Sequence, residues 1–250
     1  MFKKVILTTT IALSSAYVMA FDLPGVIKNS GADLLKAGTI SEQDVIKESR
    51  SAVEFLDSDN TVNPASAESS KRLDSLVKRV NLPEIEGVEF NFKVYQTEPD
   101  NLNAFATPDG SIRFNSALMD AMTDDQVLAI IGHEIGHVVE KHSFKQMRKS
   151  LLSSAAIRAA ASQSSAGSAA YNIGGGDLAQ KFVNASFSKS DEISADKYAL
   201  KVLEEAGAKP ESMLEAIEVL KAKFGNGGGM LSSHPSNNKR IKRLKKAIAK

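Results

Sequence analysis

The sequence predicts an α+β fold, mostly helical, with a small antiparallel sheet beside one helix that carries most of the histidines. Apolar residues recur at helical spacing through most of the chain. In contrast, "GVEFNFKVYQ" (87–96) alternates apolar and polar residues, as a half-buried strand does. The following "NAFATPDGSIRFNS" (103–116) predicts two short strands around a turn at 107–110.

Length and composition favour a folded protein without a nucleic-acid partner. The chain has 250 residues, 42% hydrophobic and 24% charged, which is enough to bury a core in one large domain or in one domain with an appendage. A net charge of +1 does not point to nucleic acid, and with few aromatic residues and no tryptophan the chain shows no base-stacking surface.

Residues 1–20 have the layout of a cleavable signal peptide. A short basic start precedes "VILTTTIALSSAYVM", and a small-x-small ending places cleavage after Ala20. An N-terminal membrane anchor is the alternative, but the apolar run is shorter than the ~20 residues that span a bilayer. The chain also lacks cysteine, so it offers no disulfide and no thiol for lipid attachment. We therefore expect an exported, periplasmic protein that is soluble after cleavage.

The remaining residues, 21–250, are predicted to form a single domain. Two helices in 21–86 are expected to pack on a core formed by 87–250. The first begins at Ser41, which can cap it, and the second follows near Pro64, with Leu73, Leu76 and Val80 in its apolar stripe. Residues 159–176 are rich in Ala, Ser and Gly and are expected to bury little and to move. The stretches around Gly175 and Gly228 are candidate lids.

The segment "DDQVLAIIGHEIGHVVEKH" (124–142) holds three of the four histidines. Thr123 and Gln126 predict a capping box at the start of a helix, which we expect to continue through residue 161. His133 and His137 lie four residues apart and share one face of that helix, a spacing that suits zinc. Glu134 can reach a metal-activated water, whose pKa falls toward ~7, and take its proton. The alternative is a structural histidine pair on an amphipathic helix.

A third protein ligand must come from elsewhere in the chain. Catalytic zinc normally takes three protein ligands, but Glu140 and Ser143 stand where an extended HExxHxxGxxH motif needs Gly and His. Glu192 in "SDEISAD" is the best carboxylate candidate, and Asp196 lies one turn later, where it can accept a ring N–H from a zinc histidine. His142 would project about half-way round the helix from His133, so we interpret it as a solvated or capping histidine.

Three segments carry a resemblance to a known family. They are "NAFATPDGSIRFNSALMDAMTDDQVLAIIGHEIGHV", "FSKSDEISADKYAL" and "SHPSNNKR". HExxH followed by E-x-x-A-D and by S-H-P, with an arginine five residues beyond the proline, resembles zinc metallopeptidases of the family that contains HtpX and the CaaX prenyl proteases. Within it, the likeness is greatest to small periplasmic LoiP/YggG-type members, and it extends over most of residues 21–250.

The resemblance implies a zincin-like (gluzincin) fold and one Zn²⁺ per chain. It matches His133, His137 and Glu192 to the zinc ligands, and Glu134 to the general base.

Further matches lie around these residues. Asp196 matches the carboxylate behind a zinc histidine, His234 matches a histidine that faces the substrate carbonyl, and Arg240 matches an arginine that braces this region. The segment Asn103, Ala104, Phe105 and Ala106 resembles an edge strand above the metal, to which an extended substrate adds through main-chain bonds. The missing cysteine and the absence of a readable spanning helix depart from lipoprotein and integral-membrane relatives, and argue against lipid anchoring and cleavage within the bilayer.

The predicted function is zinc-dependent endoproteolysis of exported polypeptides, unfolded or misfolded. One alternative is a periplasmic chaperone or assembly factor with latent or weak proteolysis, and another is a helical structural protein without metal. The tail "KRIKRLKKAIAK" predicts a final helix docked by its apolar stripe. Its basic face is either simply solvated or makes weak contact with an anionic membrane surface. Substrate, oligomeric state and activation stay open.

Overall fold

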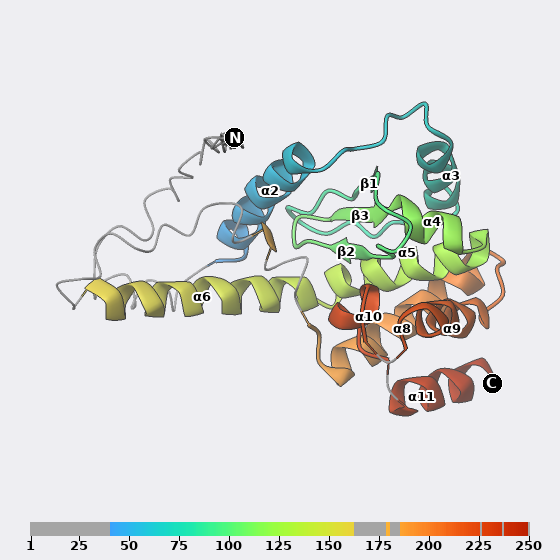
Figure 1. Ribbon diagram of the computed structural model, residues 1–250. Helices are drawn as coiled ribbons and strands as arrows, with labels where there is room; N and C mark the ends of the chain where they lie inside the picture. Colours follow the sequence, from blue (N-terminus) through green and yellow to red (C-terminus); the bar gives the residue numbers. More distant parts are fainter. Residues whose placement is uncertain (1–40, 163–178, 181–185, 226, 237, 250) are drawn as a thin grey trace, which may run out of the picture.

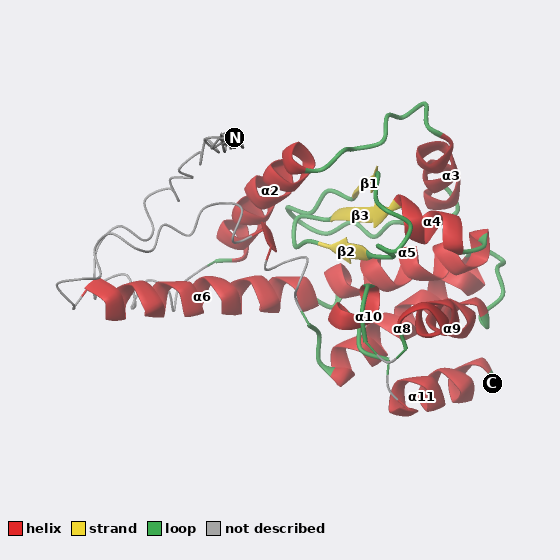
Figure 2. Cartoon of the chain, in the orientation of Figure 1, coloured by secondary structure: helices red, strands yellow, loops and turns green. Residues whose placement is uncertain are grey.

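The computed structural model describes residues 41–162, 179–180, 186–225, 227–236 and 238–249. Helices make up most of these residues and surround one small sheet (Figures 1 and 2). The predicted signal peptide and most of the Ala/Ser/Gly-rich segment, with Gly175, lie outside the described residues. None of the described helices is long and apolar enough to cross a membrane.

The sheet has three strands, β1 (Asn91–Tyr95), β2 (Ala104–Ala106) and β3 (Ser111–Asn115), in the order β1-β3-β2. β2 and β3 form the predicted antiparallel pair around the 107–110 turn. Gly110 is required there, because its φ is 92° and a Cβ would lie 2.8 Å from the carbonyl oxygen of Glu89. β1 pairs with β3 in parallel, so the prediction of a wholly antiparallel sheet was wrong. The alternating pattern indicates a strand but not the direction of its partner.

The two N-terminal helices are α2 (Glu42–Asp59) and α3 (Glu68–Val77). Ser41 and Asp44 form a capping box at the start of α2, as the sequence indicated. α2 packs against α6, and α3 packs against β1 and α5. The hydroxyl of Ser49 in α2 donates a 2.7 Å hydrogen bond to Asp109 in the β2–β3 turn. Both helices are therefore tied to the part of the chain that carries the histidines.

The predicted long histidine helix is two helices. α5 (Asp124–Val139) ends at Glu140, and α6 (His142–Ser162) begins two residues later. Between them Lys141 has a φ of 58°, a left-handed conformation that costs a non-glycine residue energy. The side chain of Lys141 forms an ion pair of 2.7 Å with Glu42 in α2. Figure 1 shows α6 leading away from α5 toward α2.

The remaining helices are α4 (Ser116–Ala121), α8 (Lys189–Glu205), α9 (Ser212–Phe224), α10 (Met230–Ser233) and α11 (Asn238–Ile248). α5 and α8 form the most extensive helix pair, because α5 presents two glycines to α8. A Cβ on Gly132 would lie 2.9 Å from the Cα of Ala199, and one on Gly136 would lie 3.0 Å from the Cα of Ala195. The backbones can approach only because these positions lack side chains. The main core lies around α5 and includes Ile112, Phe114, Leu118, Ile131, Ile135 and Leu203.

Candidate metal centre

The two histidines of α5 face α8 side by side. Thr123 and Gln126 form the predicted capping box, which fixes where α5 begins and therefore which residues face inward. His133 and His137 are one turn apart and fully buried, and their Nε2 atoms lie 3.1 Å apart. Two imidazole nitrogens so close cannot both carry a proton toward each other, so the pair either shares one N–H···N hydrogen bond or directs both lone pairs at a cation.

Glu192 reaches the histidines from the first turn of α8. Its Oε1 lies 3.3 Å from Nε2 of His137, and its Oε2 lies 3.6 Å from Nε2 of His133. Zinc–ligand bonds of ~2.0–2.1 Å in a tetrahedron place neighbouring donor atoms about 3.3 Å apart. The separations among His133, His137 and Glu192 therefore fit three corners of a zinc tetrahedron.

His234 brings a third imidazole to the same point. It follows α10 and is buried, and its Nδ1 lies 3.2 Å from Nε2 of His133 and 3.1 Å from Oε1 of Glu192. The donor atoms of His133, His137, Glu192 and His234 all lie within 4.8 Å of one another. In this arrangement His234 can act as a fourth ligand. If it turned away, it could instead face a substrate carbonyl, as the resemblance implied.

Glu134 is buried beside the four donor atoms. Neither of its carboxylate oxygens has a hydrogen-bond partner among the described residues, although Nε2 of His234 lies 3.5 Å from Oε1. An unpaired buried carboxylate is costly in a purely structural role. Its partners are therefore expected to be water and substrate, which fits the role predicted for Glu134.

Asp196 and Arg240 contact the candidate ligands and hold them in position. Oδ1 of Asp196 lies 3.1 Å from Nδ1 of His133, so it can hold the proton on Nδ1 and leave Nε2 for a metal. Arg240 donates through Nε and Nη2 to the two Asp196 oxygens, each at 2.7 Å, and its Nη1 lies 2.6 Å from Glu192 Oε2. Nη1 also donates to the main-chain oxygen of His234 at 3.3 Å. One buried guanidinium thus positions three residues of the centre.

The electrostatics keep each group in the form that its role needs. Burial lowers the pKa of His137 well below its usual value, so its imidazole is neutral. Burial alone would raise the pKa of Glu192, but Arg240 and His234 hold it well below its usual value, so Glu192 is ionised. Burial raises the pKa of Glu134, partly offset by the two nearby histidines, which makes it a stronger base than an exposed glutamate.

Of the two interpretations of His142, solvated or capping, the solvated one was wrong. His142 is buried, because the break at Lys141 turns it back toward α8. Its Nδ1 lies 3.2 Å from Nδ1 of His137, and its Nε2 lies 3.2 Å from Oγ of Ser194 and 3.5 Å from Oδ1 of Asp191. Sequence spacing could not reveal this contact, since it depends on a helix break with no glycine or proline to mark it.

The protons in this chain of contacts can be assigned. The hydroxyl of Ser194 lies within hydrogen-bond distance of main-chain oxygens in its own helix, and carboxylate oxygens only accept. His142 Nε2 must therefore donate, and its Nδ1 accepts from Nδ1–H of His137. The Nε2 lone pair of His137 is then directed at the metal position.

The segment at 103–106 lies at the sheet edge, as expected. β2 pairs only with β3 among the described strands and packs against α5. Ala104, Phe105 and Ala106 are buried, and Asn103 is half-buried. The preceding carbonyl, of Leu102, accepts a hydrogen bond from the main-chain N–H of Met230 at the start of α10. The edge strand and the segment that carries His234 are thus directly connected.

Known proteins are similar in sequence to most of this chain. The sequence matches the description "Peptidase family M48" over residues 66–248. It is 35% identical over 240 residues to "Metalloprotease LoiP" of Escherichia coli (strain K12), covering 94% of each chain. It is 32% identical to "Metalloprotease YcaL" of the same organism, covering 88% of this chain and 86% of the relative.

A solved structure shows a similar fold. The crystal structure of S. mikatae Ste24p matches with a TM-score of 0.50 at 17% identity, over 85% of this chain and 57% of that chain. This similarity concerns the fold, and it confirms the predicted zincin-like class. The family match and the two metalloprotease relatives confirm the predicted enzyme class. The chain belongs to peptidase family M48 and is a metalloendopeptidase.

Proposed function

We propose that the metal is zinc, one per chain, and that the enzyme hydrolyses peptide bonds of exported, unfolded or misfolded polypeptides in the periplasm. The observation that carries the zinc assignment is the donor set. Two imidazoles and one carboxylate, from His133, His137 and Glu192, lie 3.1–3.6 Å apart. This combination and spacing suit zinc better than calcium or magnesium, which prefer oxygen ligands.

Bound zinc would lower the pKa of a water molecule and polarise the substrate carbonyl. Glu134 would accept one proton from the attacking water as the water oxygen bonds to the carbonyl carbon. As the carbon–nitrogen bond breaks, Glu134 returns the proton to the leaving nitrogen, so that carboxylate and amine products result. Its unpaired, buried carboxylate is suited to both steps.

His234 can stabilise the negative charge that develops on the carbonyl oxygen. Burial lowers its pKa, but Glu134 and Glu192 more than compensate and raise it above the usual histidine value. A protonated imidazole beside the carbonyl oxygen would donate a hydrogen bond to the developing oxyanion. Arg240 holds the His234 main chain in place.

The preference for unfolded chains follows from the edge strand. An extended peptide can pair with β2 on the side that does not face β3, and a folded domain cannot present such a segment without local unfolding. The periplasmic location rests on the signal-like residues 1–20.

A latent enzyme is the second candidate, and the burial of the centre favours it. All five residues at the centre are buried, so part of the protein must move before a substrate can reach them. These residues are His133, Glu134, His137, Glu192 and His234. The segment that carries His234 follows Gly228 and Gly229, whose φ values are 122° and 50°. These glycines give the segment a place to bend. A chain that holds unfolded polypeptides and cleaves them only after this opening would act as the predicted chaperone-like alternative.

Cleavage of unfolded casein and of a tightly folded protein separates these functions. We expect the zinc-loaded protein to cleave casein only, and Glu134→Gln to lose about 10²–10⁴-fold in rate while it keeps its zinc. Binding of casein without cleavage by either protein would favour the latent, chaperone-like function. Cleavage that persists in Glu134→Gln would contradict the mechanism. Fractionation of cells that make the tagged protein tests the location, and recovery in the cytoplasm would contradict it.

A further inference from the structure

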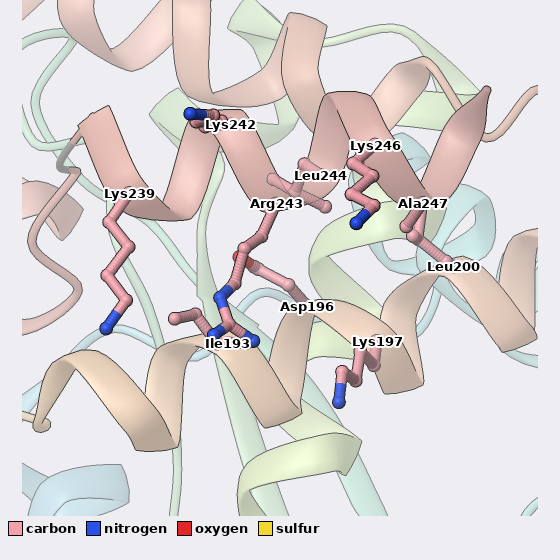
Figure 3. Close-up of a pocket in the computed structure, with 10 residues that line it drawn as sticks. All are labelled: Ile193, Asp196, Lys197, Leu200, Lys239, Lys242, Arg243, Leu244, Lys246 and Ala247. Atoms are coloured by element: carbon pink, nitrogen blue, oxygen red, sulfur yellow. The ribbon is translucent and has the colours of Figure 1, made fainter.

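A groove of about 540 Å³ lies between α8 and α11, and the proposed catalysis does not use it. Figure 3 shows the groove with side chains from both helices. Its apolar lining comes from Ile193 and Leu200 on α8 and from Leu244 and Ala247 on α11. A hollow of this size and character can take an alkyl chain.

Five cationic side chains also line the groove. Lys197 comes from α8, and the others come from α11. Figure 3 shows Arg243 reaching across from α11 toward α8. The remaining members are Lys239, Lys242 and Lys246.

These cations have no compensating acid in the groove. None of the five forms an ion pair with any residue that the structure describes. The one acidic residue in the lining, Asp196, is buried and already pairs with Arg240 through two 2.7 Å hydrogen bonds. Five like charges gathered around one hollow repel one another, and an anionic ligand would relieve that repulsion.

We infer that this groove binds an anionic phospholipid at a membrane surface, with its phosphate among the cations and part of an acyl chain on the apolar lining. Free phosphate would use the cations but not Leu200, Leu244 and Ala247. The lining also contains no aromatic residue on which a nucleic-acid base could stack. An acidic peptide would satisfy the charges, but its aspartate and glutamate side chains offer no long alkyl chain to the apolar lining.

The position of α11 fits contact with a membrane surface. Figure 1 shows α11 at the border of the molecule, away from α2 and α3. Only Arg240 and Leu244 of α11 are buried, which leaves its lysines free to meet lipid headgroups. This site does not depend on the proposed proteolysis, because its residues are not the ligands or the base.

Vesicle co-sedimentation tests the inference. The zinc-loaded protein is mixed with vesicles of phosphatidylcholine alone, or of phosphatidylcholine and phosphatidylglycerol in equal amounts. We expect binding to the anionic vesicles only. Neutralising two groove lysines, in Lys239→Gln/Lys246→Gln, should weaken binding by roughly 25-fold, since each lysine at an anionic surface contributes about fivefold.

The matched control removes the same charge elsewhere. Lys47 and Lys71 are exposed on α2 and α3, and Lys47→Gln/Lys71→Gln should bind as the unchanged protein does. An equal loss in both double variants would show that net charge alone drives binding and would overturn the groove assignment. Equal binding to neutral vesicles would overturn it too.

Competition with soluble anions distinguishes the possible ligands. Displacement by millimolar inorganic phosphate would indicate a phosphate site, and displacement by poly-glutamate but not by short-chain phosphatidylglycerol would indicate an acidic-peptide site. Either result would refute the inference that the groove binds a phospholipid.

Discussion

Nδ1 of His142 lies 3.2 Å from Nδ1 of His137, and this contact determines which nitrogen of His137 is available to a metal. His142 is itself fixed by Ser194 and Asp191. Oδ1 of Asp196 lies 3.1 Å from the corresponding nitrogen of His133, Nδ1. Both metal histidines of α5 are therefore oriented by residues that do not touch the metal position.

Replacing His142 should weaken metal binding without removing a ligand. In His142→Ala, the His137 ring loses its partner, and we expect zinc affinity to fall about 10–100-fold, as for other residues that orient zinc histidines. Competition with a chromophoric chelator measures this. Ser194→Ala, one step further from the metal, should have a smaller effect. Unchanged affinity in His142→Ala would refute the orienting role.

Gly136 should be intolerant of alanine. A Cβ there would lie 2.9 Å from the Cβ of Tyr198 and 3.0 Å from the Cα of Ala195, so α8 must move away from α5 and take Glu192 with it. We expect Gly136→Ala to lower the free energy of unfolding by about 1–3 kcal/mol and to weaken zinc binding in parallel. At Gly227 nothing lies within 4 Å of an added Cβ, so Gly227→Ala is the control. Equal behaviour of the two variants would count against the close packing of α5 and α8.

Asp57 should make the fold sensitive to acid. Burial alone would raise its pKa, but hydrogen bonds from Arg113, Lys93 and Tyr95 lower it below the usual aspartate value. A lowered folded-state pKa means that the stabilisation is complete above the unfolded-state value of ~3.9 and is lost as the pH falls through the folded-state value.

Denaturant titrations at neutral and acidic pH measure this contribution. Asp57→Asn leaves the buried Arg113 without its carboxylate, so we expect a loss of about 3 kcal/mol at neutral pH and a weaker dependence on pH below ~4. Asp59→Asn removes an exposed carboxylate from the same helix and should change little. A variant Asp57→Asn as acid-sensitive as the unchanged protein would contradict this assignment.

Local sequence signals predicted the elements that carry the centre. The capping residues Ser41 and Thr123 mark where α2 and α5 begin, and the four-residue spacing of His133 and His137 fixes their common face. The approach of Glu192 was predictable only as a candidate, because the contact between α8 and α5 depends on tertiary packing at Gly132 and Gly136.

The errors have non-local causes. Lys141 adopts a left-handed conformation, and its side chain pairs with Glu42, which lies far away in the sequence. That single residue ends α5 and brings His142 into the centre. The parallel pairing of β1 with β3 is likewise set by how the chain crosses the sheet, since the alternating residues 91–95 suit either direction.

The zinc content of the purified protein tests the central claim most directly. The account predicts one zinc per chain after purification without chelator, retained in Glu134→Gln and lost in Glu192→Ala. Circular dichroism would be used to check that each variant is folded. No zinc in the unchanged protein, or full zinc occupancy in folded Glu192→Ala, would contradict a centre built from His133, His137 and Glu192.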